Sequence, residues 1–301
     1  MSARLPNGVM AALATPLDET GQLDEQGVIR LLESLMSHSI SGICPVGSTG
    51  ESPLLERATR VRLTSLVSER ITEGIWNIPA SMSNTLAEVV EDLRLYADAG
   101  ANAALVTPPF YYQHNSEAIR RWFESVVESS PLPIVLYNIP AFTKISTPPE
   151  VVAQLAKDPR VIGMKDSSRD MEYFENVLKA VKGSSFSLLT GTDTMLLASG
   201  ILGASGTIAA SVNLVPEIVT GLWDAITAGS WESARELQNN LLAIVGACRE
   251  AGFPAGWKAA LSLKGLCSKY VAFPNLPVSG PSLDRLSQRL NEAGVVLRAA
   301  I

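Results

Sequence analysis

The sequence has little of what several common classes of protein require. Only two histidines, His38 and His114, and three cysteines occur in 301 residues, and neither type clusters. A histidine-based metal site is therefore not expected, and a hydrolase triad that depends on histidine would be hard to build. Cys44, Cys248 and Cys267 are odd in number and lack a C-x-x-C spacing, which is typical of reduced thiols in a cytoplasmic protein.

Long apolar runs and an excess of basic charge are missing as well. No run approaches the roughly 18 residues that a transmembrane helix needs, and the amino terminus lacks the apolar core of a signal peptide. Lys and Arg total 24 against 30 Asp and Glu, which gives a net charge of −6 and a pI near 5.1. These values argue against nucleic acid and membrane surfaces as partners. We expect a cytoplasmic protein that acts on a small molecule.

The sequence does contain an alternation of short apolar runs with amphipathic stretches. Many of these stretches have apolar residues at helical spacing, as at Val28, Leu31, Leu32 and Leu35. Eight such units in about 225 residues predict an α/β protein with a (β/α)8 barrel, and a doubly wound sheet competes poorly because no GxGxxG or Walker A loop is present. The runs read as buried strands are residues 9–15, 41–47, 75–81, 103–108, 133–138, 161–166, 186–191 and 205–210.

The pattern changes after about residue 215, where strand-like runs stop. The remaining chain has helical spacing in residues 218–252, 257–267 and 282–300, and the first of these should contain the eighth barrel helix. We therefore predict a barrel domain over residues 1–228 and a helical extension over residues 229–301 that packs on it. Earlier in the chain, Ser52 and Pro53 are expected to begin a helix as its N-cap and first residue.

Reactive residue types stand at the ends of three predicted strands, where barrel enzymes gather their active sites. The turn GSTGE, residues 47–51, could present backbone N–H groups and the Ser48 and Thr49 hydroxyls to an anion. Tyr137 and Lys165 stand near the ends of neighbouring strands, about 5 Å apart, so they should face one cavity. Each feature alone also has a plain structural explanation: an ordinary turn, a tyrosine bonded to a carbonyl, or a lysine in solvent.

Together these residues describe a site for a 2-oxo acid such as pyruvate. A neutral lysine amine attacks a carbonyl to form a Schiff base, and the iminium withdraws electrons from the bond at the neighbouring carbon. Tyr137, relayed through Thr49, would move the protons, and the turn would hold the carboxylate beside the carbonyl. Neither a metal ion nor a separate cofactor is expected, because the covalent link to Lys165 serves as the electron sink.

Four stretches, at residues 47–51, 137–141, 163–170 and 191–213, resemble the dihydrodipicolinate synthase / N-acetylneuraminate lyase family of pyruvate-dependent class I aldolases. The likeness is collinear from about residue 8 to residue 225. It implies that Lys165 is the Schiff-base lysine and Tyr137 the general acid/base, and that Ser48 and Thr49 hold the pyruvyl carboxylate. It also aligns Tyr111, which has Tyr112 beside it, with a family tyrosine that completes the proton relay across a dimer interface. A homotetramer built as a dimer of dimers is implied in turn.

The resemblance also concerns the rest of the substrate. It places Gly191 and Ile208 at the pyruvate pocket, and Ser167 and Asp193 near the distal part of the substrate. Phe142 is the main departure, because dihydrodipicolinate synthases have an arginine there that grips the carboxylate of the second substrate.

We therefore predict a lyase that cleaves or forms a 2-keto-3-deoxy sugar acid or 4-hydroxy-2-oxoglutarate, with pyruvate and an aldehyde as the two parts. One alternative is a 4-hydroxy-tetrahydrodipicolinate (dihydrodipicolinate) synthase, which condenses pyruvate with aspartate semialdehyde. Another is a catalytically silent barrel that binds a 2-oxo acid. The low histidine count disfavours a metal-dependent aldolase.

Overall fold

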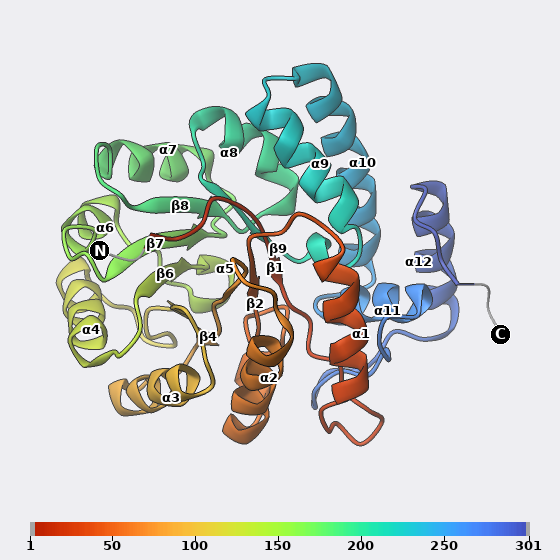
Figure 1. The fold of residues 1–301 in the computed structure, drawn as a ribbon, viewed down its shortest axis with the longest axis horizontal. Helices are drawn as coiled ribbons and strands as arrows, with labels where there is room; N and C mark the ends of the chain where they lie inside the picture. Colours follow the sequence, from red (N-terminus) through yellow and green to blue (C-terminus); the bar gives the residue numbers. More distant parts are fainter. Residues whose placement is uncertain (1–3, 299–301) are drawn as a thin grey trace.

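Short parallel strands, nine of them in the described residues 4–298, form one sheet in the computed structural model (Figure 1). Their order in the sheet is β3-β2-β1-β9-β8-β7-β6-β5-β4. Seven of the eight predicted runs contain their strands, of which the run 75–81 contains two, and β1 begins one residue before the run 9–15. The strands are β1 (Gly8–Ala12), β2 (Gly42–Cys44), β3 (Trp76–Asn77), β4 (Ala80–Ser81), β5 (Ala104–Val106), β6 (Ile134–Asn138), β7 (Val161–Asp166), β8 (Ser187–Thr190) and β9 (Gly206–Ala209).

The run 75–81 closes the sheet into a barrel. Its first half, β3, pairs with β2, and its second half, β4, pairs with β5, so the two ends of the strand order meet in one segment. Backbone hydrogen bonds continue across the break: the Ile78 N–H donates to Ile43 O at 2.9 Å, and the Leu105 N–H donates to Pro79 O at 2.9 Å. Pro79 has no N–H to donate, which interrupts the ladder at that point. The fold is therefore a (β/α)8 barrel, as predicted.

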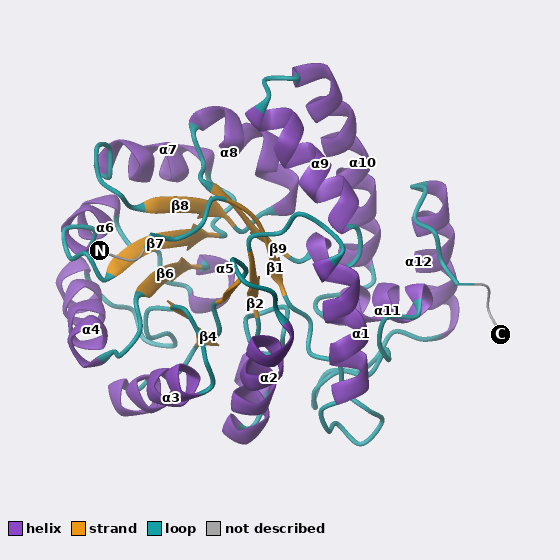
Figure 2. Ribbon diagram, viewed as in Figure 1, coloured by secondary structure: helices purple, strands orange, loops and turns teal. Residues whose placement is uncertain are grey.

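The helices surround the strands, as the purple and orange ribbons of Figure 2 show. The predicted stretch 218–252 contains two helices, α9 and α10, and the last helix ends at Glu292, before the predicted limit of residue 300. Helix α10 packs against α9, and α11 and α12 pack against α10 and against each other (Figure 1). The bounds are α1 (Glu25–Met36), α2 (Arg57–Arg70), α3 (Leu86–Asp98), α4 (Ser116–Ser129), α5 (Pro140–Thr143), α6 (Pro149–Leu155), α7 (Met171–Ala180), α8 (Leu196–Leu202), α9 (Pro216–Thr227), α10 (Trp231–Glu250), α11 (Ala255–Lys264) and α12 (Gly280–Glu292).

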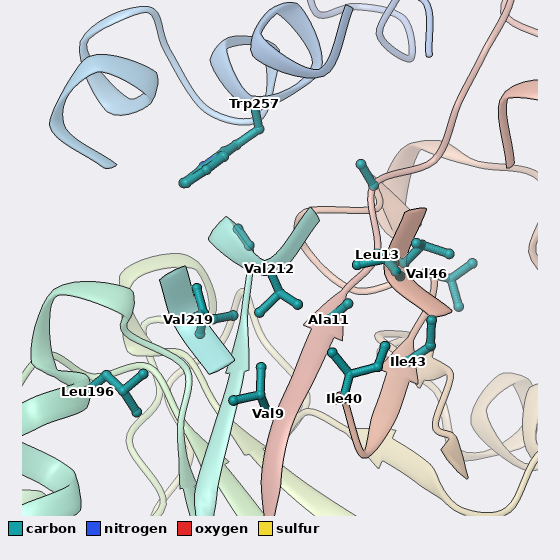
Figure 3. Close-up of a cluster of buried hydrophobic side chains, with 14 of the residues drawn as sticks. Val9, Ala11, Leu13, Ile40, Ile43, Val46, Leu196, Val212, Val219 and Trp257 are labelled. Carbon is teal, nitrogen blue, oxygen red and sulfur yellow. The ribbon is translucent and has the colours of Figure 1, made fainter. Parts of the chain in front are cut away.

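The alternation of side chains along each strand divides the core into two layers. On β1, Val9 and Ala11 point outward and join the large cluster under the helices (Figure 3), whereas Met10 and Ala12 belong to the smaller cluster inside the barrel. This outer layer also contains the buried face of α1 that its helical spacing predicted. Because both faces of a parallel barrel strand are covered, nearly continuous apolar runs identify these strands in the sequence.

Helix α2 does not begin at Ser52, so that prediction is wrong. Ser52–Leu54 forms a single 3₁₀ turn, Leu55 is extended, and Glu56 occupies the N-cap position of a helix that starts at Arg57. The break lies at Leu55 and Glu56, whose backbones are extended, with ψ of 141° and 149°. The first turn therefore cannot continue into α2.

The composition led to two expectations, one about the cysteines and one about membrane-spanning helices. Cys44, Cys248 and Cys267 are free and buried, as predicted. Within residues 4–298, no helix combines the length and the apolar character that crossing a membrane requires.

Candidate active site

The carboxyl-terminal ends of the strands surround a cavity of about 280 Å³. In barrels of this kind the loops at that end carry the chemistry. The cavity is lined by residues from strand ends, from the turns that follow them and from the C-terminal helices. Nine of the ten predicted site residues are among them: Ser48, Thr49, Tyr137, Phe142, Lys165, Ser167, Gly191, Asp193 and Ile208.

Lys165 points into the barrel and not into solvent. Met164 before it packs in the outer layer, so the pleat directs Lys165 to the inside, where it is only 4% exposed. Tyr137 stands opposite it in the β6–β7 pairing, and Lys165 Nζ lies 4.5 Å from the centre of the Tyr137 ring. In the described part of the chain, no ion pair joins Lys165 to a carboxylate. A buried amine in these surroundings can act as a nucleophile.

The hydroxyl beside Tyr137 belongs to Ser48, and this differs from the predicted relay through Thr49. Ser48 Oγ and Tyr137 Oη are 3.2 Å apart, within hydrogen-bonding distance. Thr49 also lines the cavity and is 6% exposed, but its side chain makes no hydrogen bond to the residues at positions 4–298. The turn after β2 thus directs the first of its two hydroxyls to the tyrosine, a detail of backbone geometry that the sequence GSTGE does not specify.

The same turn has the features of an anion site. Val46, just before it, and Glu51, at its end, both have left-handed backbones, with φ of 52° and 60°. A β-branched residue such as Val46 rarely adopts this conformation, so the turn stores strain that surrounding contacts must hold. Among the hydrogen bonds of the described chain, none uses the backbone N–H of Ser48 or Thr49. Two unused N–H groups beside the cavity suit a carboxylate.

Polar side chains join the carboxyl-terminal ends of β6 and β7. Asn138 Nδ2 donates to Asp166 Oδ1 at 2.8 Å, and the Ser168 hydroxyl donates to Asp166 Oδ2 at 2.8 Å. Burial raises the pKa of the Asp166 carboxyl, while the hydrogen bonds from Asn138 and Ser168 oppose that shift. Because Tyr137 and Lys165 immediately precede Asn138 and Asp166, this network positions the two candidate reactive groups.

Gly191, at the end of β8, allows the Lys165 side chain to lie against the backbone. A Cβ atom at this position would come within 2.1 Å of Ser167 Oγ and 2.7 Å of Lys165 Cε. Real Cβ atoms do not approach other atoms so closely, so the lysine or the strand end would have to move. The sequence motif predicted a pocket-lining residue here, and the structure places it in direct contact with the candidate nucleophile.

Replacing Gly191 by alanine should therefore lower kcat/KM by about 10²-fold, because a shift of about 1 Å in a reacting group has an effect of that order. Steady-state kinetics of pyruvate turnover would measure it. Gly221→Ala is the matched control, since a Cβ there meets only Leu237 Cδ1 at 3.7 Å and the residue lies in helix α9. Activity within about twofold of the unaltered protein in Gly191→Ala would show that Lys165 does not need this space.

Tyr111 is the predicted site residue that the single chain does not bring to the cavity. It is 84% exposed, has a φ of 87°, and makes an edge-to-face contact with Tyr112 at 5.0 Å between ring centres. It lines a separate surface hollow beside His114 and Arg121. Its predicted role in a partner's site depends on an interface, so it stays a prediction.

Nine of the residues that line the cavity were not predicted, and the four of them with charged or aromatic side chains are Arg169, Arg249, Phe253 and Trp257. Arg169 is part of the motif at residues 163–170, from which only Lys165 and Ser167 were assigned to the site. The other three come from α10, α11 and the loop between them, a region interpreted only as helical. Phe253 stacks on Phe142, with ring centres 5.7 Å apart, so the position expected to carry the family arginine forms an aromatic wall.

Within residues 4–298, no three or more His, Cys, Asp or Glu side chains are grouped to hold a metal ion. Cys44 lies inside the barrel near Lys165, and burial raises the pKa of its thiol to about 12. The Cys44 thiol therefore stays protonated beside the lysine.

Comparison with known proteins shows that the similarity to this family covers nearly the whole chain. The sequence model of the dihydrodipicolinate synthetase family matches residues 5–293. A 4-hydroxy-tetrahydrodipicolinate synthase from Methanothrix thermoacetophila is 31% identical over 285 residues, which cover 95% of this chain and 96% of the relative.

Solved structures show the same fold. The dihydrodipicolinate synthase of Thermotoga maritima superimposes with a TM-score of 0.93 at 27% identity, covering 97% of this chain and all of the other. YagE of E. coli K12, described as a prophage protein of the dihydrodipicolinic acid synthase family in complex with pyruvate, has a TM-score of 0.91 at 27% identity. The alignment covers 96% of this chain and 99% of YagE.

Proposed function

Because this chain belongs to the dihydrodipicolinate synthetase family, we propose that Lys165 is the residue through which it binds pyruvate covalently. Members of the family are pyruvate-dependent lyases and synthases that form or cleave carbon–carbon bonds, and the chain is such an enzyme. They use a Schiff base between a lysine and pyruvate and no external cofactor. The observation that supports Lys165 for this role is its burial inside the barrel beside Tyr137 and the anion-binding turn.

The proposed reaction has four steps: imine formation, enamine formation, attack on the aldehyde and release of Lys165. The neutral Lys165 amine adds to C2 of pyruvate, and loss of water leaves a protonated imine. Removal of a proton from C3 gives an enamine, which attacks the aldehyde carbon of the second substrate, and the aldehyde oxygen takes up a proton. Attack on C2 by water, or by an amine of the product, then releases Lys165. The reverse sequence cleaves the same bond.

Tyr137 and Ser48 are the groups placed to move these protons. Their hydroxyls are 3.2 Å apart, and both line the cavity that Lys165 faces. A phenol can give a proton to the departing water and recover one from C3 if a second hydroxyl holds it in position. The N–H groups of Ser48 and Thr49 would hold the pyruvyl carboxylate, which orients C2 towards Lys165.

For the second substrate we propose aspartate semialdehyde, which condenses with pyruvate in a 4-hydroxy-tetrahydrodipicolinate synthase. This reaction was the alternative in the sequence analysis, and we rank it above cleavage of a sugar acid or of 4-hydroxy-2-oxoglutarate. The curated relative that spans 95% of the chain has this name. The sequence argues against this reaction because Phe142, in the position of the family arginine, has no charge to bind the carboxylate of the semialdehyde. Arg169 and Arg249, which line the same cavity, supply positive charge instead.

Cleavage of a 2-keto-3-deoxy sugar acid, or of 4-hydroxy-2-oxoglutarate, stays the second candidate because of one observation. The stacked rings of Phe142 and Phe253 form an apolar wall where an arginine would grip the semialdehyde. The hydroxyls of a sugar acid could instead meet Ser167 and Asp193, which also line the cavity.

We expect kcat/KM for aspartate semialdehyde condensation to exceed that for cleavage of 2-keto-3-deoxygluconate and of 4-hydroxy-2-oxoglutarate by tenfold or more, about 1.4 kcal/mol in transition-state binding. Coupled assays of pyruvate consumption and release measure the three values on one preparation. A tenfold preference in the opposite direction would restore the sugar acid or hydroxy-oxoglutarate aldolase to first place.

Three further features stay proposals. The division into a barrel, residues 1–228, and an extension, residues 229–301, separates elements that contribute to one cavity, so we propose that the two act as one unit. We propose a homotetramer, built as a dimer of dimers, in which the exposed Tyr111 contacts a partner's site. A cytoplasmic location is proposed from the family and the composition.

A further inference from the structure

Two arginines, Arg169 and Arg249, lie on the wall of the Lys165 cavity without a role in the steps above. In the described part of the chain, neither side chain forms an ion pair or a side-chain hydrogen bond. The other cavity-facing charges are Lys165 and Asp193, so positive groups outnumber negative ones. No contact within the described chain explains why two unpaired arginines lie beside the candidate nucleophile.

The two side chains reach the cavity from separate parts of the fold. Arg169 lies in the turn between β7 and α7 and has a left-handed backbone, with a φ of 64°. Arg249 lies in the last turn of α10, in the C-terminal extension, and is half-buried. Their convergence is therefore a product of the tertiary fold.

The two charges are close enough to affect each other. The pKa of the Arg249 guanidinium is lowered, first by burial and then by the positive charge of Arg169, while Asp193 opposes the shift. Within residues 4–298, Asp193 forms no ion pair with either arginine, and its Oδ1 accepts a hydrogen bond from the Ser211 N–H at 2.9 Å. A ligand anion would relieve the repulsion between two guanidinium groups.

We propose that Arg169 and Arg249 bind an anionic group at the distal end of the aldehyde substrate, in place of the arginine that Phe142 replaces. This inference deepens the proposed function and rests on it. The pyruvyl carboxylate is assigned to the turn at residues 47–51, and C2 is bonded to Lys165, so a second anion must come from the acceptor. A guanidinium binds carboxylate or phosphate through two parallel hydrogen bonds, and the two arginines can share such a group.

The aromatic wall is consistent with this arrangement. Phe253 follows Arg249 by four residues and stacks on Phe142 of α5, so the end of α10 that supplies the arginine is held close to α5. The chain of the acceptor would then pass along the rings, with its charged end at the arginines. A neutral acceptor could occupy the same path but would leave both charges unsatisfied.

The test compares three acceptors with the full-length protein: aspartate semialdehyde, D-glyceraldehyde 3-phosphate and the neutral D-glyceraldehyde. Arg169→Gln and Arg249→Gln should lower kcat/KM for an anionic acceptor by roughly 10- to 100-fold, the effect of losing a charge-assisted hydrogen bond. The value for glyceraldehyde should change by no more than about twofold. Arg249→Lys should recover part of the loss, because it keeps the charge without the bidentate geometry.

Arg235→Gln is the matched control, since Arg235 is an exposed residue on the same helix and, among residues 4–298, pairs only with Glu232. Borohydride trapping of pyruvate on each variant gives a readout that the proposal leaves unchanged. A loss confined to aspartate semialdehyde would identify a carboxylate as the ligand, and a loss confined to the phosphorylated aldehyde would identify a phosphate.

Two outcomes would overturn the proposal alone: equal losses for neutral and anionic acceptors with trapping intact, or an unaltered protein that prefers glyceraldehyde to both anions. Failure of the unaltered protein to trap pyruvate would overturn the proposed function and this inference with it.

Discussion

Lys165→Ala should abolish covalent trapping of pyruvate and lower kcat by about 10⁴-fold or more. Removal of a covalent nucleophile eliminates the whole reaction path, whereas removal of a binding group would cost only one contact. Borohydride reduces the imine to a stable secondary amine, so peptide mass spectrometry should find the pyruvate-derived group on Lys165 of the unaltered protein. The alanine variant should show none.

Two other lysines provide the comparison. Lys144 lies on the outside of the loop after β6, and its Nζ donates to Ala141 O at 2.8 Å, so Lys144→Ala should still trap pyruvate at Lys165. Lys258 is fully buried and already paired with Glu51. An adduct on either of these residues in the unaltered protein, or continued trapping in Lys165→Ala, would refute the assignment. The catalytically silent barrel would then gain support if pyruvate still bound.

The second large effect concerns stability. Lys258→Met should lower the free energy of unfolding by about 3–5 kcal/mol, because it leaves a buried carboxylate without its counter-charge. Lys258 Nζ donates to Glu51 Oε1 at 2.8 Å, both side chains are 0% exposed, and the Ala272 N–H donates to Glu51 Oε2 at 2.8 Å. After the substitution only the Ala272 hydrogen bond would compensate the charge on Glu51.

Urea unfolding at one protein concentration measures the change, since association of subunits would shift the midpoint if the concentration varied. Lys179→Met is the control: Lys179 pairs with Glu175 on the surface of α7, and an exposed pair contributes about 0–1 kcal/mol. A loss below about 1 kcal/mol in Lys258→Met would mean that the core tolerates an unpaired Glu51. The double variant Glu51→Gln with Lys258→Met should recover part of the stability because no buried charge remains.

The buried pair also connects the active site with the C-terminal extension. Glu51 is the last residue of the turn whose Ser48 and Thr49 line the cavity, and Lys258 lies in α11. The left-handed backbone of Glu51 directs its carboxylate to that helix. The extension thus holds the turn from one side and supplies Arg249 and Trp257 to the cavity, which supports treating barrel and extension as one unit.

Several parts of this site could be predicted because the barrel topology determines where the end of each strand lies. Residues at the ends of parallel strands must meet at one end of the barrel, so the sequence predicts that Tyr137 and Lys165 face one cavity, and both line it. The eight apolar runs were recognisable because strands covered on both faces need apolar side chains at nearly every position.

Other parts depend on backbone geometry and on contacts between distant segments. No pattern in the sequence shows that Ser48, and not Thr49, contacts Tyr137, or that Glu51 turns away from α2 towards Lys258, 207 residues later. The arginines Arg169 and Arg249 are 80 positions apart and follow no motif in common.

The sequence by itself determined the barrel, its order of strands and helices, and the place of the candidate nucleophile Lys165 near the end of β7, because periodicity and strand ends are local properties. The tertiary structure alone decided which hydroxyl meets Tyr137, how the run 75–81 closes the ring, and which charges surround the distal part of the cavity. These features arise where segments far apart in the chain pack together, and the position of each side chain there depends on all of its neighbours.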